Sequence, residues 1–102
     1  MIVFGGFDDG FRSNRAHRLN LVTNTWENLR CSGPEPKPRT GHSAVVYEDT
    51  MIIFGGKDDD NTKLNDVWLL DITALTWKQL VYEENDVKPT ARSGHSAVLF
   101  KT

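Results

Sequence analysis

The chain has 102 residues, which is enough for one small domain and too few for two of ordinary size. Its twelve basic and fourteen acidic residues give a net charge of -2, so no broad basic surface is available to hold nucleic acid or an anionic membrane. Hydrophobic residues make up 38% of the chain in runs of only about four, which favours a packed core and excludes both disorder and a transmembrane helix.

Short runs of β-branched and aromatic residues follow one another along the chain and are separated by polar turns, a pattern typical of strands. No segment keeps an apolar period of 3.6 over the eleven residues that would support a helix. In chain order we expect a strand in 1–6, a loop over 7–15, two strands within 16–29, a loop over 30–41, strands at 42–47, 51–55, 66–71 and 76–81, a loop over 82–94, and a strand at 95–100.

The sequence repeats itself with a period of about 50 residues. Three blocks return in the same order, and the spacing grows only across polar stretches that contain Gly or Pro. Each unit is a small antiparallel sheet of four strands, which cannot bury both of its faces alone, so neighbouring units must stack. The returning blocks are Met1–Gly6 as Met51–Gly56, Thr25-Trp26 as Thr76-Trp77, and Arg39–Val45 as Arg92–Val98.

This unit resembles the Kelch repeat of β-propellers, in which a glycine pair ends the second strand and a tryptophan lies on the fourth. The residues that carry the resemblance are Gly5, Gly6 and Trp26 in one unit, and Gly55, Gly56 and Trp77 in the next, with Trp68 on a Kelch-like third strand. An Arg-x-Gly-His-Ser-Ala segment precedes the first strand at 39–44 and 92–97, and such a segment is common in intracellular Kelch proteins of the non-BTB kind; it contains the Gly-His pairs Gly41-His42 and Gly94-His95. They also imitate the WD repeat, but that repeat is shorter, and no Trp-Asp dipeptide occurs here.

The resemblance implies an all-β, Kelch-type propeller segment of about two blades. Residues 1–41 would form a partial blade that starts at its second strand, residues 42–94 a complete blade with its following loop, and residues 95–102 the first strand of a further blade. A propeller has four to eight blades. We therefore expect a piece of a longer Kelch protein, a module that closes a ring by self-association through its edge strands, or an open module with unpaired edges.

The residues that return in every unit are expected to serve the unit's structure. Glycine at the strand ends allows positive φ and close backbone approach. Trp26 and Trp77 are expected to anchor the packing between blades, with ligand stacking as the alternative. His42 and His95 are expected to pack or to bond the backbone, because neither has a further metal ligand at suitable spacing.

The long loops 7–15, 30–41, 57–65 and 82–94 should all project from one face, where a rigid scaffold presents a recognition surface. Aromatic and charged residues there are the candidates for contact with a protein or peptide partner, and solvated loops without a function are the alternative. For the two arginines that precede Gly-His, the sequence favours cross-linking of neighbouring strands or blades, with partner contact as the alternative. The candidates are Phe7, Phe11, Arg12, Arg15, Arg39, Lys57, Asp60, Lys63 and Arg92.

The sequence indicates no catalytic residues, metal site or cofactor. Asp58-Asp59-Asp60 lacks the further ligands of an EF-hand, which favours a solvated or turn-capping role. The alternative to a protein-interaction scaffold is part of an enzyme similar to galactose oxidase, but the tyrosines and histidines are too scattered to assign as copper ligands. Cys31 is a lone cysteine, and no signal peptide is visible, so we expect an intracellular protein, cytoplasmic or nuclear.

Overall fold

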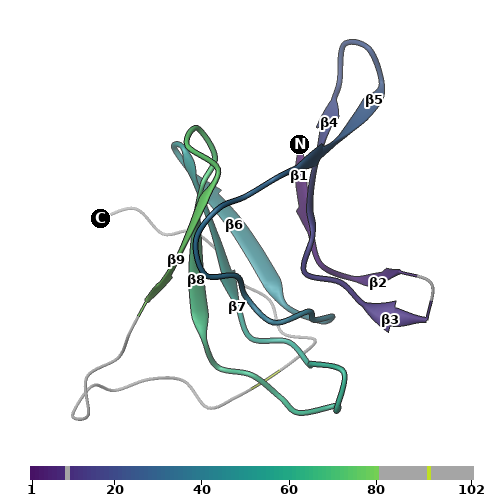
Figure 1. Cartoon of the computed structure of the whole chain (residues 1–102), viewed down its shortest axis with the longest axis vertical. Coiled ribbons are helices and arrows are strands. Elements are labelled where there is room, and N and C mark those ends of the chain that lie inside the picture. Colours follow the sequence, from purple (N-terminus) through teal and green to yellow (C-terminus); the bar gives the residue numbers. More distant parts are fainter. Residues whose placement is uncertain (9, 81–91, 93–102) are drawn as a thin grey trace.

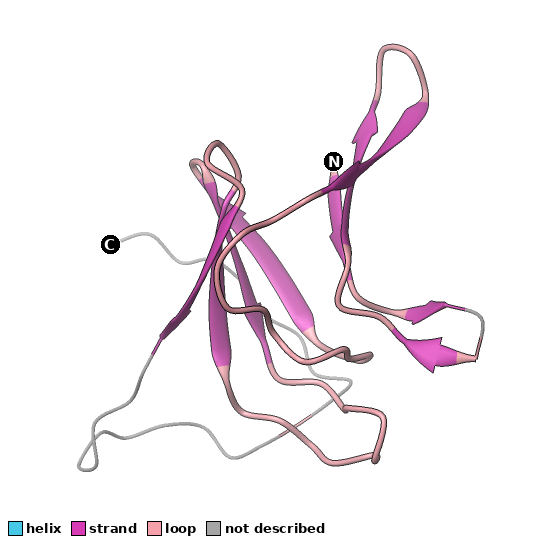
Figure 2. Ribbon diagram, in the orientation of Figure 1, coloured by secondary structure: helices cyan, strands magenta, loops and turns pink. Residues whose placement is uncertain are grey.

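The structure, a computed structural model, describes residues 1–8, 10–80 and 92. Their regular secondary structure consists of strands that form a three-stranded sheet, a two-stranded hairpin and a four-stranded sheet (Figures 1 and 2). No helix in this part of the chain is long and apolar enough to cross a membrane. The strands are β1 (Ile2–Phe4), β2 (Phe7–Asp8), β3 (Phe11–Arg12), β4 (Ala16–Asn20), β5 (Thr25–Leu29), β6 (Ser43–Tyr47), β7 (Thr50–Phe54), β8 (Val67–Asp71) and β9 (Thr76–Leu80).

The four-stranded sheet is antiparallel, in the order β6-β7-β8-β9, as the repeat predicted. The turn between β8 and β9 forms because the Asp71 carboxylate accepts hydrogen bonds from the backbone N–H groups of Thr73 and Ala74, at 3.0 and 2.9 Å. Asn20 does the same for the turn between β4 and β5. The two c–d turns, between the third and fourth strands of each unit, are therefore built by the same side-chain chemistry.

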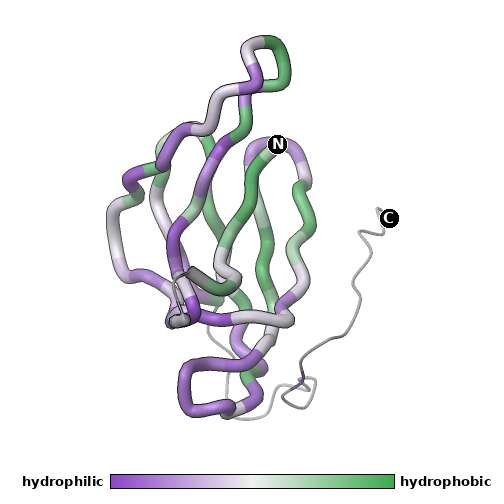
Figure 3. Tube along the Cα trace, turned by 90° about the vertical axis from the view of Figure 1, so that its right-hand side faces the viewer, coloured by the Kyte–Doolittle hydropathy of each residue, from purple (hydrophilic) through white to green (hydrophobic). Residues whose placement is uncertain are grey.

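The core lies between the three-stranded sheet, ordered β1-β4-β5, and the four-stranded sheet. Trp77 is its centre: the indole meets the Phe4 ring edge-on, with centroids 5.1 Å apart, and the Trp68 ring at 6.4 Å. Strand alternation brings these rings together, because it places every second residue on the inner face. Figure 3 shows hydrophobic residues along the strands and mostly hydrophilic residues in the loops. The buried apolar residues are Phe4, Ala16, Leu29, Met51, Ile53, Trp68, Leu70 and Trp77.

The predicted fold class is confirmed: the chain is all-β, with antiparallel sheets of about two blades. The blade boundaries stay a prediction. Gly94, His95, the strand at 95–100 and nearly all of the 82–94 loop lie outside the described residues.

One element was not predicted, the β2–β3 hairpin within the 7–15 loop. Gly10, with a φ of +87°, allows its tight turn, and the Asp-Gly dipeptide at 9–10 is a hairpin signal that could have revealed it.

Candidate functional site

One glycine of each pair lies where two segments of the backbone come close together. A Cβ atom on Gly56, which has a φ of +98°, would lie 2.7 Å from the carbonyl oxygen of Thr40, and one on Gly5 would lie 2.8 Å from that of Arg39. A side chain fits at neither position. The backbone hydrogen bonds repeat between units. The Gly6 N–H donates to the carbonyl of Arg39, and the Arg39 N–H donates to the carbonyl of Ser13. In the second unit, Gly56 donates to Arg92 and Arg92 to Leu64 in the same way.

His42 fills the space that the glycines leave open. Its ring meets the Phe4 ring edge-on, with centroids 5.5 Å apart. Its Cε1 atom would be 2.9 Å from a Cβ on Gly5, and its own Cβ 3.1 Å from one on Gly56. The structure therefore places this histidine in the packing between the units.

Arg39 is fully buried, at 0% exposure, and forms a bidentate ion pair with Asp66. Its Nη1 and Nη2 atoms donate to the two carboxylate oxygens at 2.6 and 2.8 Å, and Nη1 also donates to the carbonyl of Gly55. Trp68 Nε1 donates to the same carboxylate at 2.8 Å. The prediction that Arg39 contacts a partner is corrected: the ion pair holds the guanidinium inside the protein, where it ties the 30–41 connection to the four-stranded sheet.

The Asp66 ion pair gives the fold a pH dependence. Burial acts to raise the Asp66 pKa, but the hydrogen bonds and charge of Arg39 and the Trp68 hydrogen bond outweigh it and hold the pKa below the ordinary 3.8. Since the folded-state pKa is the lower one, the stabilisation is present above the unfolded value and is lost as the pH falls through the folded value. The free energy of unfolding, measured in urea from about pH 7 to about pH 2, should fall accordingly. Asp66→Asn should remove the part of this pH dependence that comes from Asp66. The same pH profile in both proteins would contradict it.

Arg12 connects the β2–β3 hairpin to the second long loop. Its backbone N–H donates to Asp59 Oδ1 at 3.0 Å, and its side chain donates to Thr40 Oγ1 at 2.8 Å and to Asn61 Oδ1 at 3.0 Å. The guanidinium carbon also lies 5.0 Å from the centre of the Phe7 ring. The contact of Arg12 with a partner stays a prediction. In the structure its guanidinium braces two loops against each other.

The hairpin that Arg12 braces carries two exposed aromatic rings. Phe7 and Phe11 are 68% and 71% exposed. They belong to successive cross-strand pairs, Phe7 with Arg12 and Asp8 with Phe11, so their side chains leave opposite faces of the hairpin. We call the surface formed by residues 6–8, 10–15, 37–41 and 57–65 the loop face. Figure 1 shows β2, β3 and the β7–β8 connection at the same end of the molecule.

The second loop of the loop face is shaped by Asp58, which is buried. Its carboxylate accepts hydrogen bonds from the backbone N–H groups of Asp60 and Thr62, both at 3.0 Å, which is a turn-capping role. Lys57 is half-buried and exchanges backbone hydrogen bonds with Thr40. Among the described residues, no three His, Cys, Asp or Glu side chains are placed to hold a metal ion. The remaining predicted residues are exposed: Arg15, Asp60, Lys63 and Arg92.

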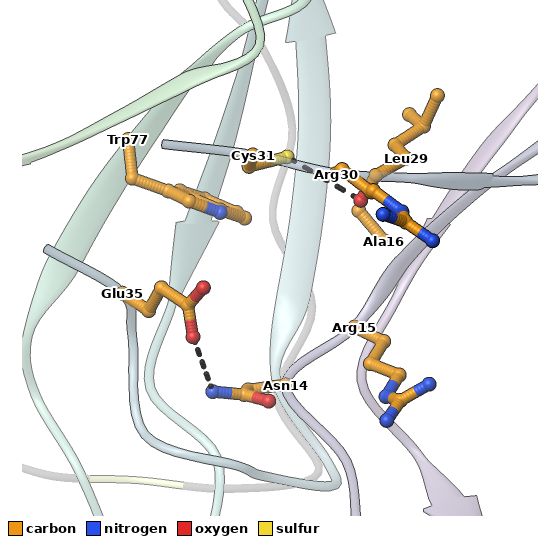
Figure 4. A pocket seen from close by; sticks show the side chains of 8 residues that line it. All are labelled: Asn14, Arg15, Ala16, Leu29, Arg30, Cys31, Glu35 and Trp77. Carbon is orange, nitrogen blue, oxygen red and sulfur yellow. Dashed lines mark hydrogen bonds between the residues drawn. The ribbon is translucent and has the colours of Figure 1, made fainter. Parts of the chain in front are cut away.

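A pocket of about 340 Å³ lies between the two sheets (Figure 4). It forms because the 30–41 connection does not stay at the loop face: the Ser32 N–H donates to the carbonyl of Leu75, and the Trp77 N–H donates to that of Ser32. The sequence carries no signal for this crossing, which depends on how the sheets stack. The pocket is lined by Asn14, Arg15, Ala16, Leu29, Arg30, Cys31, Glu35 and Trp77.

The pocket holds a thiol that is unsuited to nucleophilic chemistry. Burial and the charge of Glu35 raise the pKa of Cys31, which keeps the thiol protonated at neutral pH. Its Sγ donates to the carbonyl of Leu29 at 3.8 Å, and Asn14 Nδ2 donates to Glu35 Oε2 at 3.3 Å. The pocket was not predicted as a site, although Arg15 on its rim was a candidate.

Trp26 differs from its repeat counterpart Trp77. It is 57% exposed, whereas Trp77 is 5% exposed. In β5, Trp26 and Leu29 are three positions apart and therefore lie on opposite faces, and the Leu29 face is the one that packs on the four-stranded sheet. The expected inter-blade contact of Trp26 is thus absent from the described part of the chain, because its face points away from the second sheet.

The two stacked antiparallel sheets carry a glycine pair after β1 and after β7, and a tryptophan on β5 and on β9. This combination defines repeats of the Kelch β-propeller class. The comparison with known families agrees. The KLHDC2/KLHL20/DRC7 Kelch-repeats domain matches residues 1–102, and the chain belongs to this Kelch-repeat family.

The chain is similar to parts of several longer Kelch proteins. It is 33% identical over 100 residues to acyl-CoA-binding domain-containing protein 5 of Arabidopsis thaliana, covering 96% of the chain and 15% of that protein. It is 37% identical over 99 residues to the Rab9 effector protein with kelch motifs of Bos taurus, with coverages of 94% and 26%. It is 36% identical over 101 residues to Kelch domain-containing protein 1 of Homo sapiens, with coverages of 97% and 24%. The chain therefore spans no more than about a quarter of these relatives.

Proposed function

We propose that the loop face is a protein-binding surface and that the chain acts by presenting it rigidly, without chemistry. The observation that carries the proposal is the β2–β3 hairpin, which exposes Phe7 and Phe11 while Arg12 fixes it to the second loop. Kelch propellers commonly mediate protein binding, and the family match supports that general role here.

The hairpin has the properties of an interface anchor. Large exposed aromatic side chains supply most of the apolar area that hot spots bury. The hydrogen bonds of Arg12 to Asp59, Thr40 and Asn61 lower the entropy that the loops would lose on binding. Asp60 and Lys63 add exposed charged side chains to the loop face, and interfaces commonly have such a polar rim.

The test removes both rings and compares the result with an equal change at the other end of the molecule. Phe7→Ser with Phe11→Ser should weaken binding of a captured partner protein at least tenfold, because two anchors of more than about 1 kcal/mol each are lost. The control is Leu21→Ser with Val22→Ser: these residues are 69% and 92% exposed in the β4–β5 turn, away from the loop face. Affinity is measured by titration, after thermal unfolding has shown that the variants are folded.

Two results would contradict the proposal that the loop face binds a protein. One is full binding by the variant without the rings, and the other is an equal loss in the turn control. The proposal extends to an intracellular location, supported by the free thiol of Cys31. Metal analysis tests its non-catalytic part, since stoichiometric copper in the purified chain would favour the alternative similar to galactose oxidase.

A further inference from the structure

The two exposed rings of the loop face lie on opposite sides of one thin element, the β2–β3 hairpin. Each strand of this hairpin has 2 residues, and Phe7 pairs with Arg12 whereas Phe11 pairs with Asp8. Directly opposite residues of an antiparallel pair share a face, and successive pairs alternate between the two faces. Phe7 therefore lies on one face together with Arg12, and Phe11 lies on the other.

The two faces of the hairpin have different surroundings, because the Arg12 side chain donates hydrogen bonds to Thr40 Oγ1 and Asn61 Oδ1. The face that carries Phe7 is therefore turned toward the 57–65 loop. The guanidinium carbon lies 5.0 Å from the centre of the Phe7 ring, yet that ring is 68% exposed. Phe11 is 71% exposed on the face turned away from the loop. A flat partner surface can cover only one of these two rings.

The face with Phe7 also carries a positive charge that no ion pair neutralises in the described part of the chain. The ion pairs found in that part do not include Arg12. Its guanidinium donates from Nε to the Thr40 hydroxyl and from Nη2 to the Asn61 amide, and both acceptors are uncharged. Asp59 accepts from the backbone N–H of Arg12, not from the guanidinium. Nη1 keeps its donors for a further acceptor, and a carboxylate complements them in charge and in geometry.

We propose that the hairpin enters a cleft of a single partner protein, which encloses Phe7 and Phe11 between two apolar walls and places a carboxylate against Arg12. This inference rests on the proposed function of the loop face and adds the shape and the charge of the partner. Aromatic side chains bury about 150–250 Å² each, and interface anchors of this kind sit in desolvated pockets. Because Arg12 ties the hairpin to the 57–65 loop, the wall that covers Phe7 also meets that loop, and the wall that covers Phe11 does not.

Photo-cross-linking from each ring tests the two-walled cleft. The full 102-residue chain is made with p-benzoylphenylalanine in place of Phe7, Phe11 or Val22, and thermal unfolding shows that each version is folded. The versions are irradiated in a cell extract, and mass spectrometry identifies the cross-linked peptides. Positions 7 and 11 should cross-link to two different segments of the same protein. Val22, which is 92% exposed in the β4–β5 turn, is the matched control and should not cross-link to that protein.

The cross-links separate this inference from the proposed function on which it rests. A protein reached from one ring only would overturn the cleft in favour of a flat partner surface. Different proteins at the two rings would overturn it in favour of two partners, and in both cases the loop face would remain a binding surface. Cross-links from neither ring beyond those of the Val22 version would contradict the proposed function as well.

The salt dependence of the affinity tests the carboxylate, with the cross-linked partner purified. The Kd of the unaltered chain should rise at least about fivefold between about 0.05 and 0.5 M NaCl, and that of Arg12→Gln no more than about twofold. A role of Arg12 in bracing the loops alone would weaken binding by the variant but leave the salt dependence unchanged, and that result would overturn the carboxylate contact. Arg18→Gln is the charge-matched control: the Arg18 side chain is 43% exposed in β4, and the salt dependence should remain.

Discussion

Trp77→Ala is expected to lower the free energy of unfolding by about 3–5 kcal/mol, the range for removing a large aromatic side chain from a core. The indole is 5% exposed and lies between Phe4 of one sheet and Trp68 of the other, so its loss opens a cavity at the contact between the sheets. A domain of this size has a total stability of about 5–15 kcal/mol. The change therefore removes a large part of what holds the two sheets together, and urea unfolding measures it.

Trp26→Ala is the matched control, because the two tryptophans are equivalent in the repeat and opposite in burial. Measured where the chain is monomeric, it should change the free energy of unfolding by no more than about 0.5 kcal/mol, as surface substitutions do. Trp77→Phe keeps a ring in the contact and should remain folded if alanine does not. Equal effects of the two alanine variants would show that the packing of Trp77 does not hold the sheets together.

Arg39→Ala is expected to cost about 3–5 kcal/mol, because it leaves the Asp66 carboxylate partly buried without its ion partner. It also leaves the carbonyl of Gly55 without the Nη1 hydrogen bond. Arg39→Lys should recover only part of the loss, since an ammonium group cannot reproduce the two parallel hydrogen bonds. Urea unfolding at neutral pH gives the difference.

The chain offers a second ion pair as the control for Arg39. Arg18 and Glu27 are 2.8 Å apart, but their side chains are 43% and 61% exposed. Exposed pairs contribute up to about 1 kcal/mol, so Arg18→Ala should have a small effect that added salt reduces further. If Arg39→Ala proved as mild as Arg18→Ala, the buried pair would not be the tie between the 30–41 connection and the second sheet.

The sequence predicted the sheets well because their signals are local and repeated. The strands β6 to β9 follow from short β-branched runs between polar turns, and the glycine pairs and Trp77 mark the positions where the backbone or the packing leaves no choice. The repeat also predicted that neighbouring units stack. The stacking itself is visible in the contact between Phe4 and Trp77.

The candidate site was predicted less completely, because its side chains are assigned by tertiary contacts. Arg39 and Arg12 were both candidates for partner contact, although cross-linking was favoured for Arg39. In the structure Asp66 binds the first, and Thr40 and Asn61 bind the second. Nothing in the local sequence of either arginine distinguishes an exposed guanidinium from an engaged one. The pocket beside Trp77 was missed for the same reason, since it exists only where the 30–41 connection crosses between the sheets.

The paired backbone hydrogen bonds at Arg39 and Arg92 also constrain the order in which the chain can fold. The Arg39 N–H donates to the carbonyl of Ser13 in the first long loop, and the Arg92 N–H donates to the carbonyl of Leu64 in the second. Each loop therefore depends on a hydrogen bond from a residue far later in the chain. During synthesis a loop can take its final shape only after the connection that follows its own sheet has emerged. We therefore expect folding to advance from the N-terminus, with each loop reaching its final conformation after its sheet. In pulsed hydrogen exchange, the backbone amides of the loop face should become protected later than those of the sheets.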